Sequence, residues 1–189
     1  MSFVSNFDSS EKVLEKIEAS SKKLFLPIVG REKGKLLEFL VRRYQPSKIL
    51  EIGTLVGYSA ILMAKNLEKG KITCIEISQK AAEIARKNIK EAGFKNIKVI
   101  VGDALEAILQ LKEKFSLVFI DALKEEYLFY LRALEKNRNL KKGTIIVADN
   151  AKIFAENMQA YLNYVRHSGK YKSRFVDFIN DGVEISVKL

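Results

Sequence analysis

Short apolar runs alternate with longer amphipathic segments along most of the chain. The runs are rich in Ile, Val, Leu and Phe, which is typical of strands buried on both faces of a parallel sheet. Between them, apolar residues recur three or four positions apart, and this spacing predicts helices. The predicted strands are Lys48–Ile52, Lys71–Ile77, Ile97–Val101, Phe115–Ile120 and Thr144–Ala148. Strands and helices that alternate in this way predict a doubly wound, parallel sheet.

The helices of this core are bounded by residues that start or stop helices. Gly70 ends the helix that begins at Tyr58. Ser78 can cap the next helix, which Gly93 closes. Three more helices are predicted over residues 104–112, 125–139 and 154–166.

Two amphipathic helices are predicted before the first strand. The first covers residues 9–26, and Ser9 or Ser10 can cap its N-terminus. Pro27 ends it, and the second helix covers residues 31–44. Since both precede the sheet, we expect a helical appendage that covers the ligand site or serves a dimer interface.

The C-terminal segment predicts a β-hairpin. The runs Ser173–Ile179 and Val183–Leu189 are joined by Asn180-Asp181-Gly182, a strong turn sequence. With 189 residues, 48% of them hydrophobic, the chain fits one domain. We therefore predict an α/β fold, a Rossmann-like doubly wound and mostly parallel sheet with a C-terminal antiparallel hairpin. Residues 1–45 would form a helical cap and residues 46–189 the core.

Composition and charge narrow the environment and the partners. The one cysteine, Cys74, excludes an internal disulfide and fits a reducing cytosol. Residues 1–8 do not read as a signal peptide, and no apolar run approaches the length of a membrane span. The net charge of +10 favours acidic partners such as nucleic acid, although the lysines are spread over most predicted helices. We expect a cytoplasmic protein that binds no membrane.

A turn with two glycines joins the first strand to its helix, within Ile49–Ser59. Gly53 and Gly57 can adopt positive φ and let a ligand approach the backbone closely. The first N–H groups of the helix, at Tyr58 and Ser59, point back at this turn. Open parallel sheets bind adenosine-containing cofactors at such a strand, turn and helix.

Each predicted parallel strand ends in or beside an acid, where such sheets bind ligands. Helix capping explains any one of these acids, but five at one edge indicate contacts with a ligand and a cation. Glu76 can accept hydrogen bonds from both ribose hydroxyls. Glu51 would repel a pyrophosphate, but it suits a cofactor with an ammonium and a sulfonium. The five acids are Glu51, Glu76, Asp103, Asp121 and Asp149.

Five motifs stand in order between about Gly34 and the C-terminus. They are Glu51-Ile-Gly-Thr-Leu-Val-Gly-Tyr-Ser59, Gly102-Asp-Ala104, Phe119-Ile-Asp-Ala-Leu-Lys-Glu-Glu-Tyr127, Val147-Ala-Asp-Asn150 and Asp181-Gly-Val183. Together they resemble the cation-dependent O-methyltransferases of the catechol and caffeoyl-CoA type. The resemblance implies the class I methyltransferase fold, S-adenosylmethionine (SAM) as methyl donor, a divalent cation and a homodimer.

The resemblance also implies a role for each matched residue. Turn residues hold the methionine part of SAM with Glu51 beside its ammonium, Glu76 binds the ribose, and Asp103 with Ala104 borders the adenine. The implied cofactor residues are Glu51, Gly53, Thr54, Gly57, Tyr58, Ser59, Glu76, Asp103, Ala104 and Asp121. The implied metal ligands are Asp121, Asp149 and Asn150, and the implied general base is Lys124.

Two carboxylates and an amide oxygen make a hard site suited to Mg²⁺. The positions that remain could take a substrate with adjacent hydroxyls, and the metal would lower the pKa of one of them. Lys124 would accept that proton if burial and the cation depress its own pKa. Taken alone, Lys124 is better explained as an exposed helix lysine in a lysine-rich protein, and Asp149-Asn150 could be a turn or cap pair.

Departures from the family pattern leave the acceptor open. Leu123 stands where a second acid is expected, and residues 151–155 lack an aromatic-rich substrate loop. Phe175 and Val176 occupy the neighbourhood of a late substrate-binding acid. We predict a SAM- and cation-dependent O-methyltransferase that acts on a catechol-like small molecule. The alternatives are a tRNA methyltransferase acting on a hydroxylated base and a non-catalytic SAM-binding protein.

Overall fold

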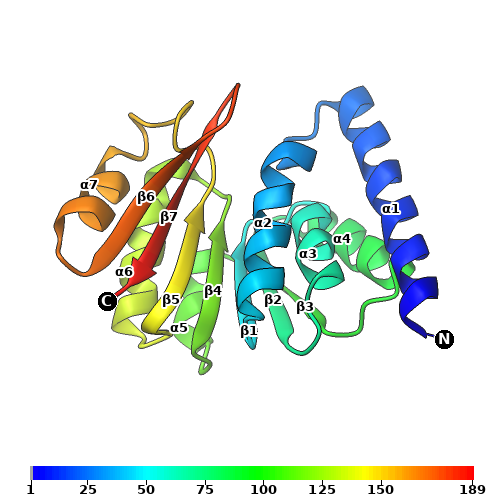
Figure 1. Cartoon of the computed structure of the whole chain (residues 1–189), viewed down its shortest axis with the longest axis horizontal. Helices are drawn as coiled ribbons and strands as arrows, with labels where there is room; N and C mark the ends of the chain where they lie inside the picture. The colour runs from blue at the N-terminus through cyan, green and yellow to red at the C-terminus, as the bar shows by residue number, and fades with distance from the viewer. Residues whose placement is uncertain (1) are drawn as a thin grey trace.

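The computed structural model describes residues 2–189, and their side chains from Ser9 onward. It contains a seven-stranded sheet in the order β3-β2-β1-β4-β5-β7-β6 (Figure 1). The strands are β1 (Lys48–Ile52), β2 (Lys71–Glu76), β3 (Ile97–Val101), β4 (Phe115–Ile120), β5 (Leu140–Ala148), β6 (Tyr171–Asp177) and β7 (Gly182–Lys188). The helices are α1 (Ser2–Leu24), α2 (Gly30–Tyr44), α3 (Tyr58–Lys65), α4 (Gln79–Glu91), α5 (Ala104–Gln110), the 3-10 turn η1 (Lys124–Glu126), α6 (Tyr127–Lys136) and α7 (Gln159–His167).

The strand pairing confirms the predicted α/β fold. β1 pairs in parallel with both β2 and β4, and β3 and β5 extend the parallel part on either side. β7 is antiparallel to both β5 and β6. The carboxyl ends of β1 to β5 therefore share one edge of the sheet.

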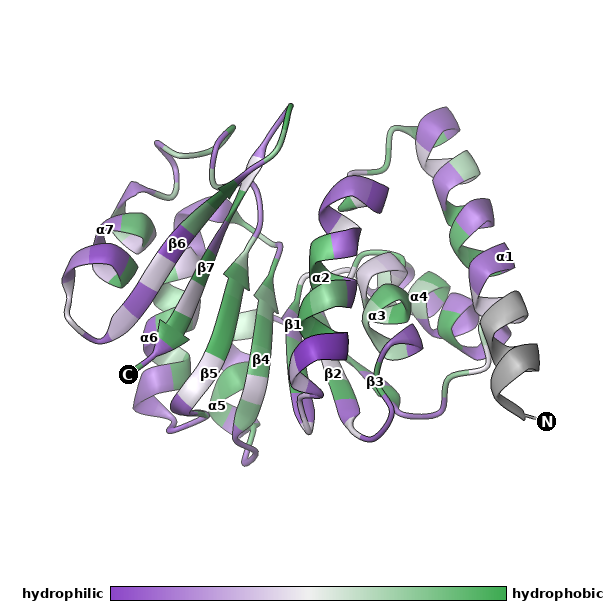
Figure 2. Cartoon of the chain, in the orientation of Figure 1, coloured by the Kyte–Doolittle hydropathy of each residue, from purple (hydrophilic) through white to green (hydrophobic). Residues whose placement is uncertain are grey.

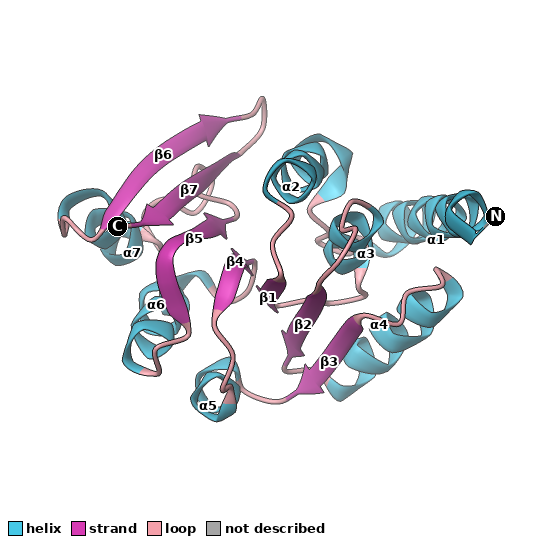
Figure 3. Ribbon diagram, turned by 60° about the horizontal axis from the view of Figure 1, so that its bottom comes forward, coloured by secondary structure: helices cyan, strands magenta, loops and turns pink. Residues whose placement is uncertain are grey.

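Helices cover both faces of the sheet, α1 to α4 on one and α5 to α7 on the other (Figure 3). Alternate residues of β1 serve the two cores: Ile49 faces α1 to α4, whereas Leu50 and Ile52 face α5 to α7. All three side chains are fully buried. The central strands are accordingly mostly hydrophobic, while the helices are polar on their outer faces (Figure 2).

The first helix is part of the core and not an appendage. Val13, Leu14 and Ile17 are buried in the cluster that contains α3 and α4. α1 begins at Ser2, so Ser9 and Ser10 lie inside it and the predicted N-cap is wrong. Ser10 is fully buried, because the helix continues past it along the same packed face.

The segment after β5 also differs from the prediction. A helix was expected from residue 154, but turns fill residues 149–158 and α7 begins at Gln159. The reason is tertiary: the Ala151 N–H donates to the Gly182 carbonyl at 2.8 Å, which holds this segment against the hairpin. The predicted cap of α4 is confirmed, since the Ser78 hydroxyl accepts from the Ala81 N–H. Along residues 2–189, no helix combines the length and apolar character needed to cross a membrane.

Candidate active site

A cavity of about 590 Å³ opens at the shared carboxyl edge of the parallel strands. Residues Pro27, Ile28 and Val29, which lead into α2, close one side of it. Most of the predicted site residues line this cavity, which brings the two halves of the predicted site together. They are Gly53, Thr54, Tyr58, Ser59, Glu76, Asp103, Ala104, Asp121, Lys124, Asp149 and Asn150.

The turn after β1 is compact because glycine occupies its tightest point. Gly53 has φ +85°, and a Cβ there would lie 2.2 Å from the Asp121 carbonyl oxygen. Any side chain at Gly53 would therefore push the turn away from the end of β4. Gly57, with φ +84°, immediately precedes α3 and packs against Ala85 instead of the cavity.

Glu51 lies behind the cavity wall and does not line it. Its carboxylate is fully buried and accepts hydrogen bonds from the hydroxyls of Thr54 and Ser59, two residues that do line the cavity. Burial raises the pKa of Glu51, and the nearby Asp121 carboxylate raises it further, against the two hydroxyl donors. Cys74 is paired with Glu51 across β1 and β2, and burial followed by the Glu51 charge raises its thiol pKa.

Glu76 and Asp103 are both engaged with backbone N–H groups. The two carboxylate oxygens of Glu76 accept from Leu55 at 2.8 Å and Ser78 at 2.9 Å. One oxygen of Asp103 caps α5 by accepting from the backbone of Leu105 at 2.8 Å and of Glu106 at 3.2 Å. Helix capping, which was considered for any single acid, therefore explains the contacts of one Asp103 oxygen. Asp103 and Glu76 nevertheless both line the cavity.

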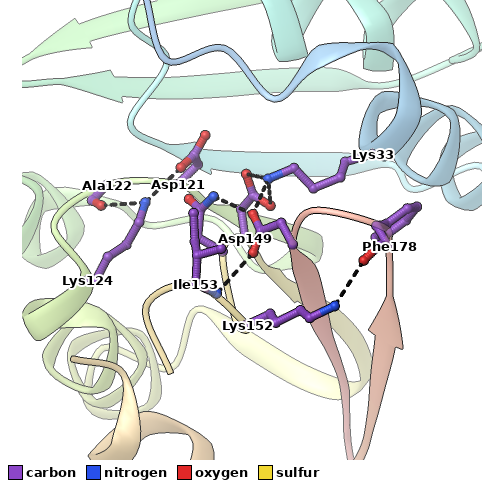
Figure 4. A network of polar contacts seen from close by, with 10 residues as sticks. Lys33, Asp121, Ala122, Lys124, Asp149, Lys152, Ile153 and Phe178 are labelled. Carbon is purple, nitrogen blue, oxygen red and sulfur yellow. Dashed lines mark hydrogen bonds and ion pairs between the residues drawn. The ribbon is translucent and has the colours of Figure 1, made fainter. Parts of the chain in front are cut away.

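Lys124 and Asp121 form an ion pair at the end of β4. The Lys124 ammonium donates to Asp121 at 2.9 Å and to the Ala122 carbonyl at 2.9 Å (Figure 4). It also lies 5.3 Å from the Tyr127 ring centre and 5.9 Å from that of Phe154. The amine is consequently held at the cavity wall, and the reading of Lys124 as a freely exposed helix lysine does not fit.

Asp149 is a buried carboxylate with one oxygen that accepts no hydrogen bond. Its Oδ2 accepts from Lys33 at 2.8 Å, whereas Oδ1 lies 2.7 Å from the same ammonium but accepts no hydrogen bond in the described structure. Burial raises the pKa of Asp149 to about 6, Asp121 raises it as well, and Lys33 opposes both. A buried carboxylate oxygen without a hydrogen bond, beside a second carboxylate, is a position where a cation compensates the lost hydration, and here the Lys33 ammonium lies beside it.

The donor set fits a hard divalent cation. Asp121, Asp149 and Asn150 follow neighbouring strands, line one cavity and offer only oxygen ligands if Asn150 presents its carbonyl. No group of three His, Cys, Asp or Glu side chains suited to a metal occurs among the described residues, so the amide is needed to complete this set.

Two residues of this cluster were missed in the sequence, Lys33 and Asp181. Lys33 of α2 bridges Asp149 and Asp181, at 2.7 Å from the latter, and Asp181 also accepts from the Asn150 amide at 2.7 Å. The Asp181-Gly-Val183 motif was a signal for Asp181, but it was interpreted only as a turn and as part of the resemblance. Lys33 carries no local signal, because it is one lysine in a lysine-rich helix.

Comparison with known proteins shows which family this chain belongs to. Residues 5–166 match the O-methyltransferase family. Catechol O-methyltransferase from Mus musculus is 32% identical over 191 residues, covering 94% of this chain and 71% of the mouse protein. The enzyme of the same name from Sus scrofa is 33% identical over 172 residues, covering 84% of this chain and 91% of the pig protein.

Solved structures agree with the sequence matches. An O-methyltransferase from Bacillus cereus in complex with SAH superposes with a TM-score of 0.85 at 28% identity, covering 94% of this chain and 91% of the other. The resemblance predicted from the five motifs is thereby confirmed. This chain belongs to the O-methyltransferase family, the SAM-dependent enzymes that include the catechol O-methyltransferases.

Proposed function

We propose that this protein transfers the methyl group of SAM to one of two adjacent hydroxyls of a catechol-like small molecule, with the help of a divalent cation. The observation that carries this proposal is the convergence of the glycine turn, Asp121, Asp149, Asn150 and Lys124 on one cavity. A cofactor residue set and an oxygen-donor set that face the same space can align donor and acceptor, and alignment supplies much of the rate.

At the donor end, the turn residues Gly53, Thr54, Tyr58 and Ser59 would hold the methionine part of SAM. The hydroxyls of Thr54 and Ser59 lie between the cavity and Glu51. The Glu51 carboxylate would therefore attract the SAM ammonium across these two hydroxyls, without touching it. The Glu76 carboxylate has lone pairs free on both oxygens for the ribose. Asp103 and Ala104 would border the adenine, and Gly57 would act only by setting the direction of α3.

At the acceptor end, Asp121, Asp149 and Asn150 would hold the cation and leave coordination positions for a substrate with adjacent oxygens. When bound there, a divalent cation lowers the pKa of a hydroxyl and fixes its direction. Lys124 would then receive the proton as a neutral amine. Its contact with Asp121 at 2.9 Å supports this role, because the amine lies beside a predicted cation ligand.

The cavity wall beside these polar groups suits an apolar or aromatic body. Leu123, Ile153 and Phe154 line it, with 57%, 55% and 40% of their surfaces exposed. Leu123 is the residue that replaces an expected acid, so the acceptor would meet an apolar wall there. A ring that carries two hydroxyls could pack on these side chains while its oxygens face the acids.

The net charge of +10 favours a second acceptor, a hydroxylated base in tRNA. Binding of bulk tRNA should then weaken steeply with added salt, and weak salt-insensitive binding would eliminate this candidate. A non-catalytic SAM-binding role fits less well, because it gives Lys124 and the three oxygen ligands no common purpose. A homodimer and a cytoplasmic location stay predictions, and light scattering decides the first.

Chelation tests the central proposal. Methyl transfer from labelled SAM to a panel of vicinal diols, coenzyme-linked phenols and bulk tRNA should require Mg²⁺ and stop after exhaustive chelation. SAM binding, measured by calorimetry on the same samples, should persist, because the turn residues do not include the predicted ligands Asp149 and Asn150. Methyl transfer that survives chelation would eliminate the cation from the mechanism.

A further inference from the structure

One carboxylate joins three segments that are far apart in the chain. Asp181 lies in the β6–β7 turn with 7% of its surface exposed. Its Oδ2 accepts from the Lys33 ammonium at 2.7 Å and from the Asn150 amide at 2.7 Å, and its Oδ1 accepts from the Ile153 N–H at 3.3 Å. Helix α2, the segment after β5 and the hairpin therefore meet at Asp181.

The contact with Asn150 decides which end of its side chain faces the cavity. A carboxylate can only accept hydrogen bonds, so it binds the NH₂ end of the amide and leaves the carbonyl oxygen pointing away. Asn150 is also held with φ +64°, a conformation that an asparagine tolerates better than most residues. The proposed cation ligand is thus presented by its correct atom before any cation arrives.

The contact with Lys33 positions the second ligand. Lys33 bridges Asp181 and Asp149. Its ammonium lies beside the Asp149 carboxylate (Figure 4), 2.8 Å from Oδ2 and 2.7 Å from Oδ1. Oδ1 is buried and accepts no hydrogen bond. The Asp181 carboxylate therefore leaves the amide oxygen of Asn150 free and, through Lys33, fixes the position of the Asp149 carboxylate.

The side chain of Asp181 is not required to make the turn. The turn is closed by the Asp181 carbonyl, which accepts from the Phe178 N–H at 2.9 Å. The adjacent Gly182 carbonyl accepts from Ala151 at 2.8 Å. Both oxygens of the carboxylate are instead engaged by donors on α2 and on the segment after β5.

We propose that Asp181 is a positioning residue of the cation site, which orients Asn150 directly and Asp149 through Lys33. This inference rests on the proposed function, since it assumes that Asp149 and Asn150 bind a cation. Groups that hydrogen-bond to metal ligands without binding the metal themselves typically contribute 10–100-fold to metal affinity. Asp181 touches neither the predicted SAM residues nor the reacting atoms, so its effect should be confined to the cation.

Two substitutions separate position from charge. Asp181→Ala removes both the charge and the hydrogen bonds, whereas Asp181→Glu keeps the charge and displaces the oxygens by one methylene. Asp177→Ala is the matched control, because Asp177 carries the same charge on the same hairpin and pairs with Lys152 at the surface. Mn²⁺ binding is followed by electron paramagnetic resonance of the free ion, and SAM binding by calorimetry.

We expect both Asp181 variants to bind Mn²⁺ about 10–100-fold more weakly than the wild type, with SAM affinity and the control unchanged. Wild-type affinity in Asp181→Glu would reduce the effect to charge and overturn the positioning role. Equal losses of Mn²⁺ and SAM affinity would also overturn it, because they indicate general damage. If the wild type itself binds no Mn²⁺, the proposed cation dependence fails, which is a separate result.

A further variant keeps the test valid if Asp181→Ala fails to fold. Asp181→Leu fills a similar space without an acceptor and leaves Lys33 paired with Asp149, so no buried charge loses its last partner. Asn150 is still unoriented in this variant, and we expect the same weakening of Mn²⁺ binding. Wild-type Mn²⁺ affinity in Asp181→Leu would contradict the proposal.

Discussion

At the scale of single residues, Glu51 shows how a buried charge can be prepared for a charged ligand. Its carboxylate has no exposed surface, and two hydroxyls of the cofactor turn donate to it. Burial raises its pKa, so the folded protein without cofactor favours the proton more than the unfolded chain does. A cationic ligand on the cavity side would favour the ionised form instead.

Glu51→Gln should change how stability depends on pH. Because the pKa of Glu51 is raised above 4.5 on folding, its contribution to stability is full at lower pH and is lost as the pH rises through the folded value. The variant lacks this loss, so its stability should fall less than that of the wild type from acid to neutral pH. SAM affinity should decrease at the same time.

Urea unfolding across this pH range measures the effect in the cofactor-free protein. Glu83→Gln is the control, since Glu83 lies exposed on α4 and should leave the wild-type pH dependence intact. Parallel stability curves for the wild type and Glu51→Gln would contradict the prediction.

Lys124→Met should slow methyl transfer without weakening SAM binding. General acid–base groups typically contribute about 10²–10⁴-fold to a rate, so kcat toward a catechol should fall by that factor and lose its pH dependence. The exposed Lys136→Met on α6 serves as the control. An unchanged rate across pH would remove Lys124 from the mechanism.

Single residues differ in how far sequence alone can place them. Asp121 and Asp149 could be brought together on paper, because parallel strands end at one edge and each acid follows such a strand. Lys33 could not, since its partners Asp149 and Asp181 are 116 and 148 positions away and only the completed fold brings them close. The position of Glu51 behind the wall also depends on side-chain packing that no strand pattern expresses.

At the scale of whole elements, α1 changes from an expected appendage to a structural part of the sheet's cover. Its inner face packs on α3 and α4, and α3 itself begins at the cofactor turn. The Lys16–Glu91 ion pair at 3.0 Å adds a surface contact with α4. Any loosening of α1 should therefore reach the helix that starts at the cofactor turn.

Leu14→Ala tests this structural role. Leu14 is fully buried, and removal of a buried leucine side chain lowers the free energy of unfolding by about 2–5 kcal/mol. Leu24→Ala at the end of the same helix should change it by less than about 0.5 kcal/mol, because Leu24 is 67% exposed. Urea denaturation compares the two, and equal effects would mean that α1 is not part of the cooperative core.

Elements were predictable where local pattern and tertiary structure agree. The bounds of β1, β3 and β4 are as predicted, because each is a short and mostly apolar run. β1 and β4 are buried on both faces, whereas β3 is an edge strand with Lys98 exposed. The segment after β5 was not predictable, because its sequence permits a helix and only contact with the hairpin prevents one. β5 itself starts at Leu140, before the expected Thr144, with a register shift against β4 where the strand crosses Gly143.

At the scale of the whole molecule, ligand binding and stability should be linked. The proposed SAM site is built from the ends of β1, β2, β3 and β4, so a ligand there joins segments that separate on unfolding. At a concentration 100 times its Kd, SAM should add about 2.7 kcal/mol to the free energy of unfolding. For a domain of this size that corresponds to an increase in Tm of roughly 5–10 °C.

Thermal denaturation with SAM, SAH and NAD⁺ measures this link. SAM and SAH should raise Tm, whereas NAD⁺ should not, because its pyrophosphate would approach the Glu51 charge behind the turn. An equal increase with NAD⁺ would contradict the assignment of the turn to a cationic cofactor.

The alkylation rate of Cys74 can report how often the folded protein opens. Cys74 is the chain's one thiol, it has no exposed surface, and it lies against Glu51 beneath the turn that is proposed to hold SAM. A thiol reagent can reach it only during moments when the strands around it part. The alkylation rate therefore measures the frequency of these openings in the unmodified protein, without a dye or an added tryptophan. Slower alkylation in the presence of SAM would show that the ligand lowers the frequency with which the central strands separate.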